Sequence, residues 1–407
     1  MRSNRSSLAS PTTPRRGRQV PPAPPIVVGG PAVVALALAV LALAACKFPY
    51  PEELPVDALD AAPVDAPDAA VDAAPVDAPP TGIGAFAPAG TLVAGRMDAA
   101  AVRVGDRLYV VGGVVCTGCA AVGADGGGVT ASVEVATVSP AGPGAFALAS
   151  PLGRARAGAA AFRVTRGGND WLYVVGGYRD DGGVAFPLEI ERAAIAGDGT
   201  IGAFADVGGV ALDEGRAHAR ALVTADHVYL IGGWAGGSSY RATVTAAAID
   251  GSGDLGAFAP VSGVQLSSAR ARVTLVGDGG LTLVAGGHAA GAPVTAVERA
   301  TLSGGTLTGF TAVPTLATAR AGATGFALSG RAWLAGGGAP IAGTATDSIE
   351  TAQLSPAGPF VLNSRRLDQA RVLAAGALLP AHVCVIGGSA TAQRAGILDS
   401  VACAPLQ

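Results

Sequence analysis

A short apolar strand that ends in two glycines recurs six times, and this repeat restricts the possible folds more than any other feature. Successive doublets stand 50 to 64 positions apart. An arginine precedes each doublet, at one fixed distance in five units and at a longer distance in the second. Such a period is typical of architectures in which each unit is one small sheet that packs against its neighbours. The six segments are LYVVGG (108–113), LYVVGG (172–177), VYLIGG (228–233), TLVAGG (282–287), AWLAGG (332–337) and VCVIGG (383–388).

Each unit has the pattern of four short strands joined by turns rich in glycine, proline and aspartate. The strand after the arginine is rich in alanine and glycine, which indicates crowding around a centre. The Gly-Gly strand is a continuous apolar run, which indicates that it is covered on both faces. A third strand and then a phenylalanine follow. The repeated arginines are Arg96, Arg156, Arg216, Arg270, Arg320 and Arg371, and the phenylalanines are Phe86, Phe146, Phe204, Phe258, Phe310 and Phe360.

Over residues 83–407 these units resemble the kelch family, whose blades carry a Gly-Gly doublet at the end of the second strand and an aromatic residue on the outer strand. The resemblance implies an all-β fold, a six-bladed β-propeller. The chain departs from the family pattern because phenylalanine stands where kelch units usually have tryptophan, and because the tyrosine before the turn is missing. The longer period and the lack of a Trp-Asp ending exclude the WD40 type.

The order of strands predicts how such a ring would close. The chain has an extra outer strand, IGAFAPAG (83–90), before the first repeated arginine, and the sixth unit ends at Gln407 without an outer strand. We therefore expect Phe86 and its strand to complete the last blade (368–407). This pairing would remove an exposed sheet edge.

The N-terminal segment predicts export. The leader (1–18) carries five arginines and no acid, and an apolar run follows over 26–45. Its ending, Leu43-Ala44-Ala45-Cys46, resembles the bacterial lipobox, which implies a signal peptide (1–45) and a lipid on Cys46. An uncleaved membrane helix and an ordinary signal peptide are the alternatives. Lys47 replaces the aspartate that tends to keep such lipoproteins at the inner membrane, so we expect an outer-membrane lipoprotein of the cell envelope.

Residues 46–82 are dominated by proline, alanine, valine and aspartate, which predicts a disordered, extended tether. The predicted domains are thus the signal peptide (1–45), the tether (46–82) and the propeller (83–407). With 14% charged residues and a net charge of −3, the chain has no basic surface of the kind that nucleic acids require. The partners expected are the membrane, through the lipid, and a protein or a glycan.

The repeated arginines allow two interpretations. They could line a channel mouth and bind an anion, or they could pair with glutamates that recur on the third strand: Glu134, Glu191, Glu298 and Glu350. The third and sixth units lack this acid. If a ligand is bound, the arginines of those units, Arg216 and Arg371, are the candidates.

The cysteines predict two disulfides. Cys116 and Cys119 lie in a glycine-rich loop (114–128), where a disulfide is expected in an exported protein; a redox pair, half of a zinc site and free thiols are the alternatives. Cys384 and Cys403 fall on adjacent strands of the last unit. A disulfide is expected there too, against two separate buried thiols.

Recognition is expected on the loops after the Gly-Gly doublets, because these segments vary most between units. The alternative is that these loops differ between units only because they lie on the surface. The candidate ligand-binding residues are Tyr178, Arg179, Asp181, Arg216, His218, Trp234, Tyr240, His288 and Arg371.

The sequence leads to two functional hypotheses. The first is a lipid-anchored recognition or scaffold protein that binds a protein or glycan through one propeller face. The alternative is a periplasmic carbohydrate-active isomerase or mutarotase, because kelch propellers include a six-bladed sialic-acid mutarotase. Such an enzyme needs a poised acid–base pair, and the sequence assigns none. We expect no cofactor and no metal; DGSGD (250–254) has calcium-like spacing but stands where a tight turn is needed.

Overall fold

The computed structural model describes residues 81–116, 127–180, 183–278, 280–339, 343–391 and 396–407. Within these ranges the regular structure is β-strand, without an α-helix. The described part of the chain accordingly contains no helix capable of crossing a membrane. The predicted signal peptide, Cys46 and all but the last two residues of the tether lie outside the described residues, as do Cys119 and Asp181.

The described strands form six main antiparallel sheets, numbered here by the repeat unit that supplies their first strand. Sheet 1 contains β3 (Ala100–Val104), β4 (Arg107–Val111), β7 (Val133–Ser139) and β9 (Ala147–Ala149), with β8 (Gly142–Pro143) beside β7. Sheet 2 contains β10 (Ala160–Arg166), β11 (Asn169–Val175), β12 (Glu189–Ala194) and β13 (Ala205–Ala211). Sheet 3 contains β14 (Arg220–Val223), β15 (His227–Ile231), β16 (Thr243–Ala248) and β17 (Ala259–Gln265).

The remaining main sheets follow the same order of first, Gly-Gly, third and outer strand. Sheet 4 contains β18 (Thr274–Asp278), β19 (Leu281–Ala285), β22 (Val297–Ser303) and β23 (Thr306–Val313). Sheet 5 contains β24 (Thr324–Leu328), β25 (Arg331–Ala335), β28 (Ser348–Gln353) and β29 (Val361–Arg366). Sheet 6 contains β30 (Ala375–Leu378), β31 (His382–Ile386), β32 (Ser400–Pro405) and β1 (Ala87–Thr91).

Short ribbons form in the loops between the second and third strands of several units. In unit 1, β5 (Val114–Cys116) and β6 (Gly127–Val129) belong to such a loop, and β2 (Arg96–Met97), which precedes the first strand, pairs with β5. The others pair β20 (His288–Ala289) with β21 (Ala292–Pro293), and β26 (Gly338–Ala339) with β27 (Thr344–Ala345). These ribbons lie at the ends of the Gly-Gly strands, where the sequence varies between units.

Sheet 6 is built from both ends of the described chain. Strand β1 pairs antiparallel with β32, from Ala87 opposite Cys403 to Thr91 opposite Ser400. This is the pairing expected from the strand order, and Phe86 is 8% exposed in the adjoining core. A disulfide joins Cys384 on β31 to Cys403 on β32, which confirms the predicted pair.

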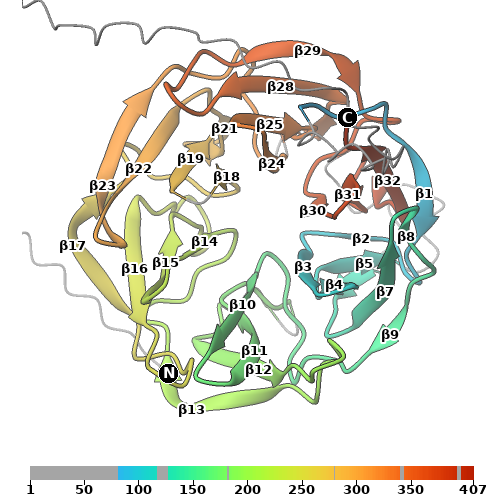
Figure 1. The fold of residues 1–407 in the computed structure, drawn as a ribbon. Helices are drawn as coiled ribbons and strands as arrows, with labels where there is room; N and C mark the ends of the chain where they lie inside the picture. Colours follow the sequence, from blue (N-terminus) through green and yellow to red (C-terminus); the bar gives the residue numbers. More distant parts are fainter. Residues whose placement is uncertain (1–80, 117–126, 181–182, 279, 340–342, 392–395) are drawn as a thin grey trace, which may run out of the picture. The chain divides into compact units, whose positions relative to one another are not determined.

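The first strands of the six sheets contact one another in cyclic order, β3, β10, β14, β18, β24, β30 and again β3 (Figure 1). A backbone hydrogen-bond ring lies beside them, two residues after each repeated arginine. In this ring each peptide N–H donates to the carbonyl of the preceding unit. The bonds run from Gly158 to Asp98, His218 to Gly158, Arg272 to His218, Gly322 to Arg272, Leu373 to Gly322 and Asp98 to Leu373.

The Gly-Gly doublet contacts the backbone of the next unit. Gly176 has a φ of +69°, and a Cβ on it would lie 2.6 Å from the carbonyl oxygen of Arg216. The next residue, Gly177, donates its N–H to that same oxygen at 2.9 Å. Only glycine combines the left-handed backbone with so close an approach. The doublet is therefore a joint between successive units as well as the end of a strand.

Candidate functional site

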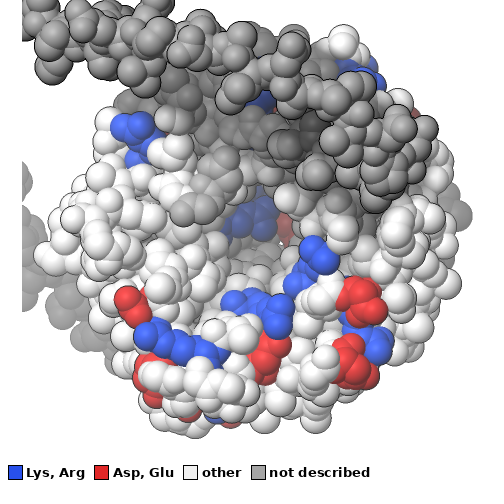
Figure 2. Space-filling model, viewed as in Figure 1, with Lys and Arg blue, Asp and Glu red and all other residues white. Residues whose placement is uncertain are grey.

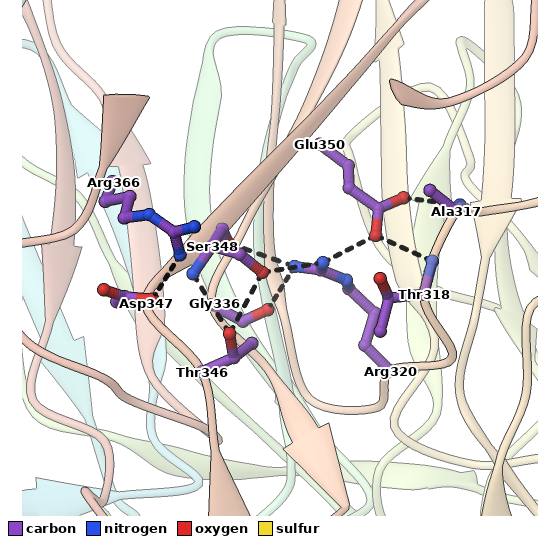
Figure 3. Close-up of polar contacts among 9 residues, drawn as sticks. All are labelled: Ala317, Thr318, Arg320, Gly336, Thr346, Asp347, Ser348, Glu350 and Arg366. Carbon is purple, nitrogen blue, oxygen red and sulfur yellow. Dashed lines mark hydrogen bonds and ion pairs between the residues drawn. The ribbon is translucent and has the colours of Figure 1, made fainter. Parts of the chain in front are cut away.

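The six repeated arginines are buried inside the repeat, each no more than 2% exposed. In unit 5, Arg320 donates from Nη1 to the carbonyl oxygens of Gly336 at 2.8 Å and Ser348 at 3.1 Å (Figure 3). The equivalent arginines contact the corresponding carbonyls of their own units. Each arginine therefore ties the end of the Gly-Gly strand to the start of the third strand.

A glutamate completes this arrangement in four units. Arg320 Nη2 donates to Glu350 Oε1 at 2.6 Å, and Glu350 also accepts the N–H groups of Ala317 at 2.9 Å and Thr318 at 3.0 Å (Figure 3). Burial lowers the pKa of Arg320, and the charge and hydrogen bond of Glu350 oppose that shift. Glu134, Glu191 and Glu298 pair with their arginines in the same way. This geometry favours the structural interpretation of the repeated arginines.

The two units without that glutamate obtain their acid from the loop before the arginine. Asp368 lies 2.9 Å from Arg371, and Asp213 and Glu214 lie 3.9 and 3.5 Å from Arg216. The sequence contains the signal, because Asp stands three residues before the arginine only in these two units. The other units have Val93, Gly153, Ser267 and Ala317 at that place. The two arginines considered for ligand binding are thus also paired within their sheets.

A channel runs between the first strands and contains a cavity of about 180 Å³. Its wall includes the residue four positions after each repeated arginine, which is Ala100, Ala160, Arg220, Thr274, Thr324 or Ala375. Arg220 on β14 is the one charged residue in this lining. Figure 2 shows basic surface within the central hollow, where most of the surrounding described surface is uncharged.

A charged cluster adjoins this cavity on the side of the backbone ring. Asp98, His218 and Arg272 lie two residues after their repeated arginines and share a small cavity of about 20 Å³ with Arg220. Asp98 Oδ1 is 3.4 Å from His218 Nδ1, and Arg272 Nη2 is 3.4 Å from His218 Nε2. All three residues have φ near +55°, a conformation that costs a non-glycine residue on the order of 1 kcal/mol.

Burial changes the acid–base behaviour of this cluster. It lowers the pKa of His218 well below its usual value, and the charges of Arg272 and Arg220 add to that shift. It raises the pKa of Asp98 against the opposing effect of the same two arginines. His218 is therefore a neutral imidazole at pH 7, held between an acid and a guanidinium.

An aromatic cluster from units 2 and 3 lies against the same histidine. The rings of Tyr178 and His218 are 5.7 Å apart, and that of Trp234 is 6.2 Å from Tyr178 and 6.1 Å from His218. Phe186 meets Trp234 edge to face at 5.1 Å. Tyr240 and His288 form a further ring pair at 5.5 Å. These are geometries in which aromatic rings attract one another.

The structure thus brings together most of the aromatic candidates, but not all of the candidate residues. Arg179 pairs through its backbone with Ala185 and lines a separate hollow with Asp180 and Arg154. Arg216 and Arg371 lie within their own sheets. Asp181 is outside the described residues, and the predicted Cys116–Cys119 disulfide includes a residue that is also outside them.

Sequence reasoning missed Asp98, Arg220, Arg272 and Phe186. Only Arg220 has a detectable signal, because the other five units place alanine or threonine at its repeat position. The position of Asp98 and Arg272 is glycine in units 2 and 5, histidine in unit 3 and leucine in unit 6, so the repeat does not single these two residues out.

No cluster of histidine, cysteine or acidic residues suited to a metal ion is found among the residues that the structure describes. The DGSGD segment (250–254) forms a tight turn. Asp250 Oδ1 accepts hydrogen bonds from the N–H groups of Ser252 and Asp254, both at 2.9 Å, and from the Ser252 hydroxyl. The described geometry therefore accounts for this aspartate through the turn itself.

Comparisons with known proteins bear on the fold alone. No protein-family model matches the chain, and no curated protein matches it. Among 417 matching chains of solved structure is the one titled "Structure of YjhT", which is 14% identical, with a TM-score of 0.57. The alignment covers 77% of this chain and 95% of that one. This likeness supports the fold alone, which is all-β in the described residues.

Proposed function

We propose that this chain is an exported, lipid-anchored recognition protein of the cell envelope that binds a protein or glycan through one face of a six-bladed propeller. The observation that carries the proposal is the aromatic cluster of Tyr178, Phe186 and Trp234, with Tyr240 and His288 beside it. Aromatic side chains supply large, rigid contact area, and they are enriched at the centres of protein interfaces.

The surroundings of this cluster support a recognition role. In the loop that carries Phe186, Val184 is 57% exposed and Leu188 is 43% exposed. Apolar side chains next to partly buried rings form a surface that a partner can cover. The cluster rests on Gly-Gly joints and buried arginines that repeat in every unit, so the scaffold below it is rigid.

The proposed closed ring of six blades is supported by two independent sets of contacts. Strand β1 pairs with β32, and the backbone hydrogen bonds beside the channel pass through all six units and return to Asp98. The proposed export is supported by the Cys384–Cys403 disulfide, which fits an oxidising compartment. The lipid on Cys46 rests on the sequence pattern.

The test is a binding screen of the purified full chain against glycans and isolated envelope proteins. Trp234→Ala should weaken binding of the captured partner at least tenfold, because tryptophan anchors of this kind contribute roughly 2 kcal/mol or more at interfaces. Trp171→Ala is the matched control. Trp171 lies near the start of β11, at the end of the strand away from the Gly-Gly doublet, and its ring stacks on Arg192. Equal loss in both variants, or none in Trp234→Ala, would reject this face as the binding surface.

A second candidate function, a sugar isomerase or mutarotase, is favoured by the Asp98–His218 pair. A buried acid beside a neutral imidazole can accept and return a proton. The pair ranks second because its cavity of about 20 Å³ holds no more than a water molecule. Anomerisation of aldoses and acidic sugars, followed by NMR, tests it: acceleration by the wild type that is lost in His218→Asn would support the enzyme.

A further inference from the structure

We propose that the central channel is a binding site for a small carboxylate anion, held by Arg220. This inference goes beyond the proposed recognition function and does not depend on it, because the aromatic surface and the channel cavity use different residues. It rests on the departure of Arg220 from the repeat, on the balance of charges in the channel, and on the geometry of its guanidinium.

Arg220 stands where the repeat calls for a small side chain. The other five units place alanine or threonine at this position. Crowding of first strands around the channel explains small residues there, and it gives no reason for the longest basic side chain. The repeat therefore does not account for Arg220, in contrast to the six arginines that pair with acids in their own sheets.

The charges around the channel leave an excess of one positive charge. The ionisable residues that line its two cavities are Asp98, His218, Arg220 and Arg272. With His218 neutral, two guanidinium groups face a single carboxylate. Arg220 and Arg272 are partly exposed where they line these cavities, and an anion bound beside them would balance the extra positive charge.

The guanidinium of Arg220 is held in place by one hydrogen bond, and its other donor groups are available to a ligand. Its Nε donates to the carbonyl oxygen of Val273 at 2.9 Å, which fixes the plane of the group. Its two terminal nitrogens make no hydrogen bond to any residue that the structure describes. The threonine hydroxyls of the cavity wall already have acceptors, because Thr274 donates to the carbonyl of Ala323 and Thr324 to that of Ala374. Arg220 is therefore the side chain in the wall that would bind the anion.

The chemistry of the ligand follows from this geometry. Two adjacent terminal nitrogens present parallel N–H groups, and a carboxylate accepts them with both oxygens. The cavity of about 180 Å³ corresponds to roughly six water molecules of liquid volume. Its alanine and glycine lining offers apolar contact to a short carbon chain. An anion of the size of acetate or lactate fits these limits, and a polymer does not.

The experiment is calorimetric titration of acetate, lactate and chloride into the full chain in a zwitterionic buffer without added salt. The wild type should bind acetate or lactate at one saturable site, and Arg220→Gln should weaken that binding at least tenfold. Arg220→Lys keeps the positive charge but lacks the parallel N–H groups of a guanidinium, so its affinity should fall between those of the wild type and Arg220→Gln. Arg163→Gln, at the surface pair with Asp170, is the matched control and should bind as the wild type does.

Ala100→Leu keeps Arg220 but fills the cavity, so it should also abolish acetate and lactate binding. This second variant tests the site even if the Arg220 variants fail to fold. Several results would overturn the proposal. These are no acetate or lactate binding by the wild type, unchanged binding in both Arg220→Gln and Ala100→Leu, or chloride binding as tight as that of the carboxylates. Loss of envelope-partner binding in Trp234→Ala with intact acetate binding would separate this site from the recognition surface.

Discussion

The repeated arginines and the channel arginines are the same residue type in two different settings. Arg320 and its equivalents are buried, and each has an acid within its own unit and two backbone carbonyls that accept hydrogen bonds from Nη1. Arg220 and Arg272 occur once each at their repeat positions and share one carboxylate, Asp98. The difference teaches that repetition marks the residues that hold the units together, whereas departure from the repeat marks candidates for function.

The largest effect is expected when a repeated arginine loses its acid. Glu350→Ala leaves Arg320 buried without a counter-charge and removes the acceptor of two backbone N–H groups. Breaking a buried pair from one side costs about 3–5 kcal/mol. The free energy of unfolding, measured by denaturant titration followed by circular dichroism, should fall by that amount.

Sheet 6 supplies the matched rescue for that variant. Ala317→Asp places an acid three residues before Arg320, as Asp368 stands before Arg371. Combined with Glu350→Ala, it should recover a substantial part of the lost stability, whereas alone it should crowd two acids around one arginine and destabilise. A double variant no more stable than Glu350→Ala would show that the two kinds of pairing are not equivalent.

The next effect concerns the sheet that joins both ends of the described chain. The disulfide between Cys384 and Cys403 closes a loop with a sequence separation of 19. Constraint of the unfolded chain by such a loop is worth about 3 kcal/mol. Cys384→Ala with Cys403→Ala should lower the free energy of unfolding by about this amount, and a reducing agent should then have no further effect. An unchanged unfolding midpoint in the double variant would remove the disulfide from this account.

A smaller effect should distinguish the channel cluster by its pH dependence. Burial keeps the pKa of His218 below its ordinary value of 6.5, so below that pH the unfolded chain binds a proton that the folded protein does not. Stability from this group is present above pH 6.5 and is lost as pH falls. Asp98, Arg220 and Arg272 surround the ring, and the pKa of Asp98 is raised, which has the opposite sign near its own titration.

The measurement is the unfolding temperature of the wild type and His218→Asn between pH 7.5 and 5. Asparagine tolerates the left-handed backbone and does not titrate. The wild type should lose stability below pH 6.5 more steeply than the variant. Parallel profiles would mean that His218 titrates freely in the folded protein.

The smallest effect is a gain in stability at a channel residue. Arg272 has a φ of +56°, and units 2 and 5 place Gly158 and Gly322 at the same position. Arg272→Gly should therefore stabilise the protein by about 1 kcal/mol, since it relieves a backbone conformation that favours glycine. The reverse change, Gly322→Ala, should destabilise it. A loss of stability in Arg272→Gly would place Arg272 among the structural residues.

Much of the fold could be predicted from the sequence because it depends on local, repeated patterns. The four-strand units, the buried Gly-Gly strands, the pairing of β1 with β32 and the Cys384–Cys403 disulfide follow from spacing and strand order. The acid beside Arg371 was also predictable, since Asp368 stands three residues before it in the sequence.

The candidate site could be predicted only in part. Tyr178, Trp234 and His288 follow Gly-Gly doublets, so their clustering on neighbouring units was accessible from the repeat. The meeting of Asp98 with His218 and Arg272 was not, because it joins units 1, 3 and 4 across the channel and requires the cyclic contacts of the first strands. Phe186 lies in the loop between β11 and β12, several residues beyond the position that directly follows the doublet.

The most direct test of the central claim compares two arginine variants in buffer without a carboxylate anion. Arg320→Gln and Arg220→Gln remove the same charged group from a repeated and from an unrepeated position. The unfolding temperature should fall sharply in Arg320→Gln, because Glu350 is left buried without its partner. In Arg220→Gln it should stay the same or rise, because an excess positive charge is removed from the channel. A sharp fall in Arg220→Gln with little change in Arg320→Gln would contradict the account.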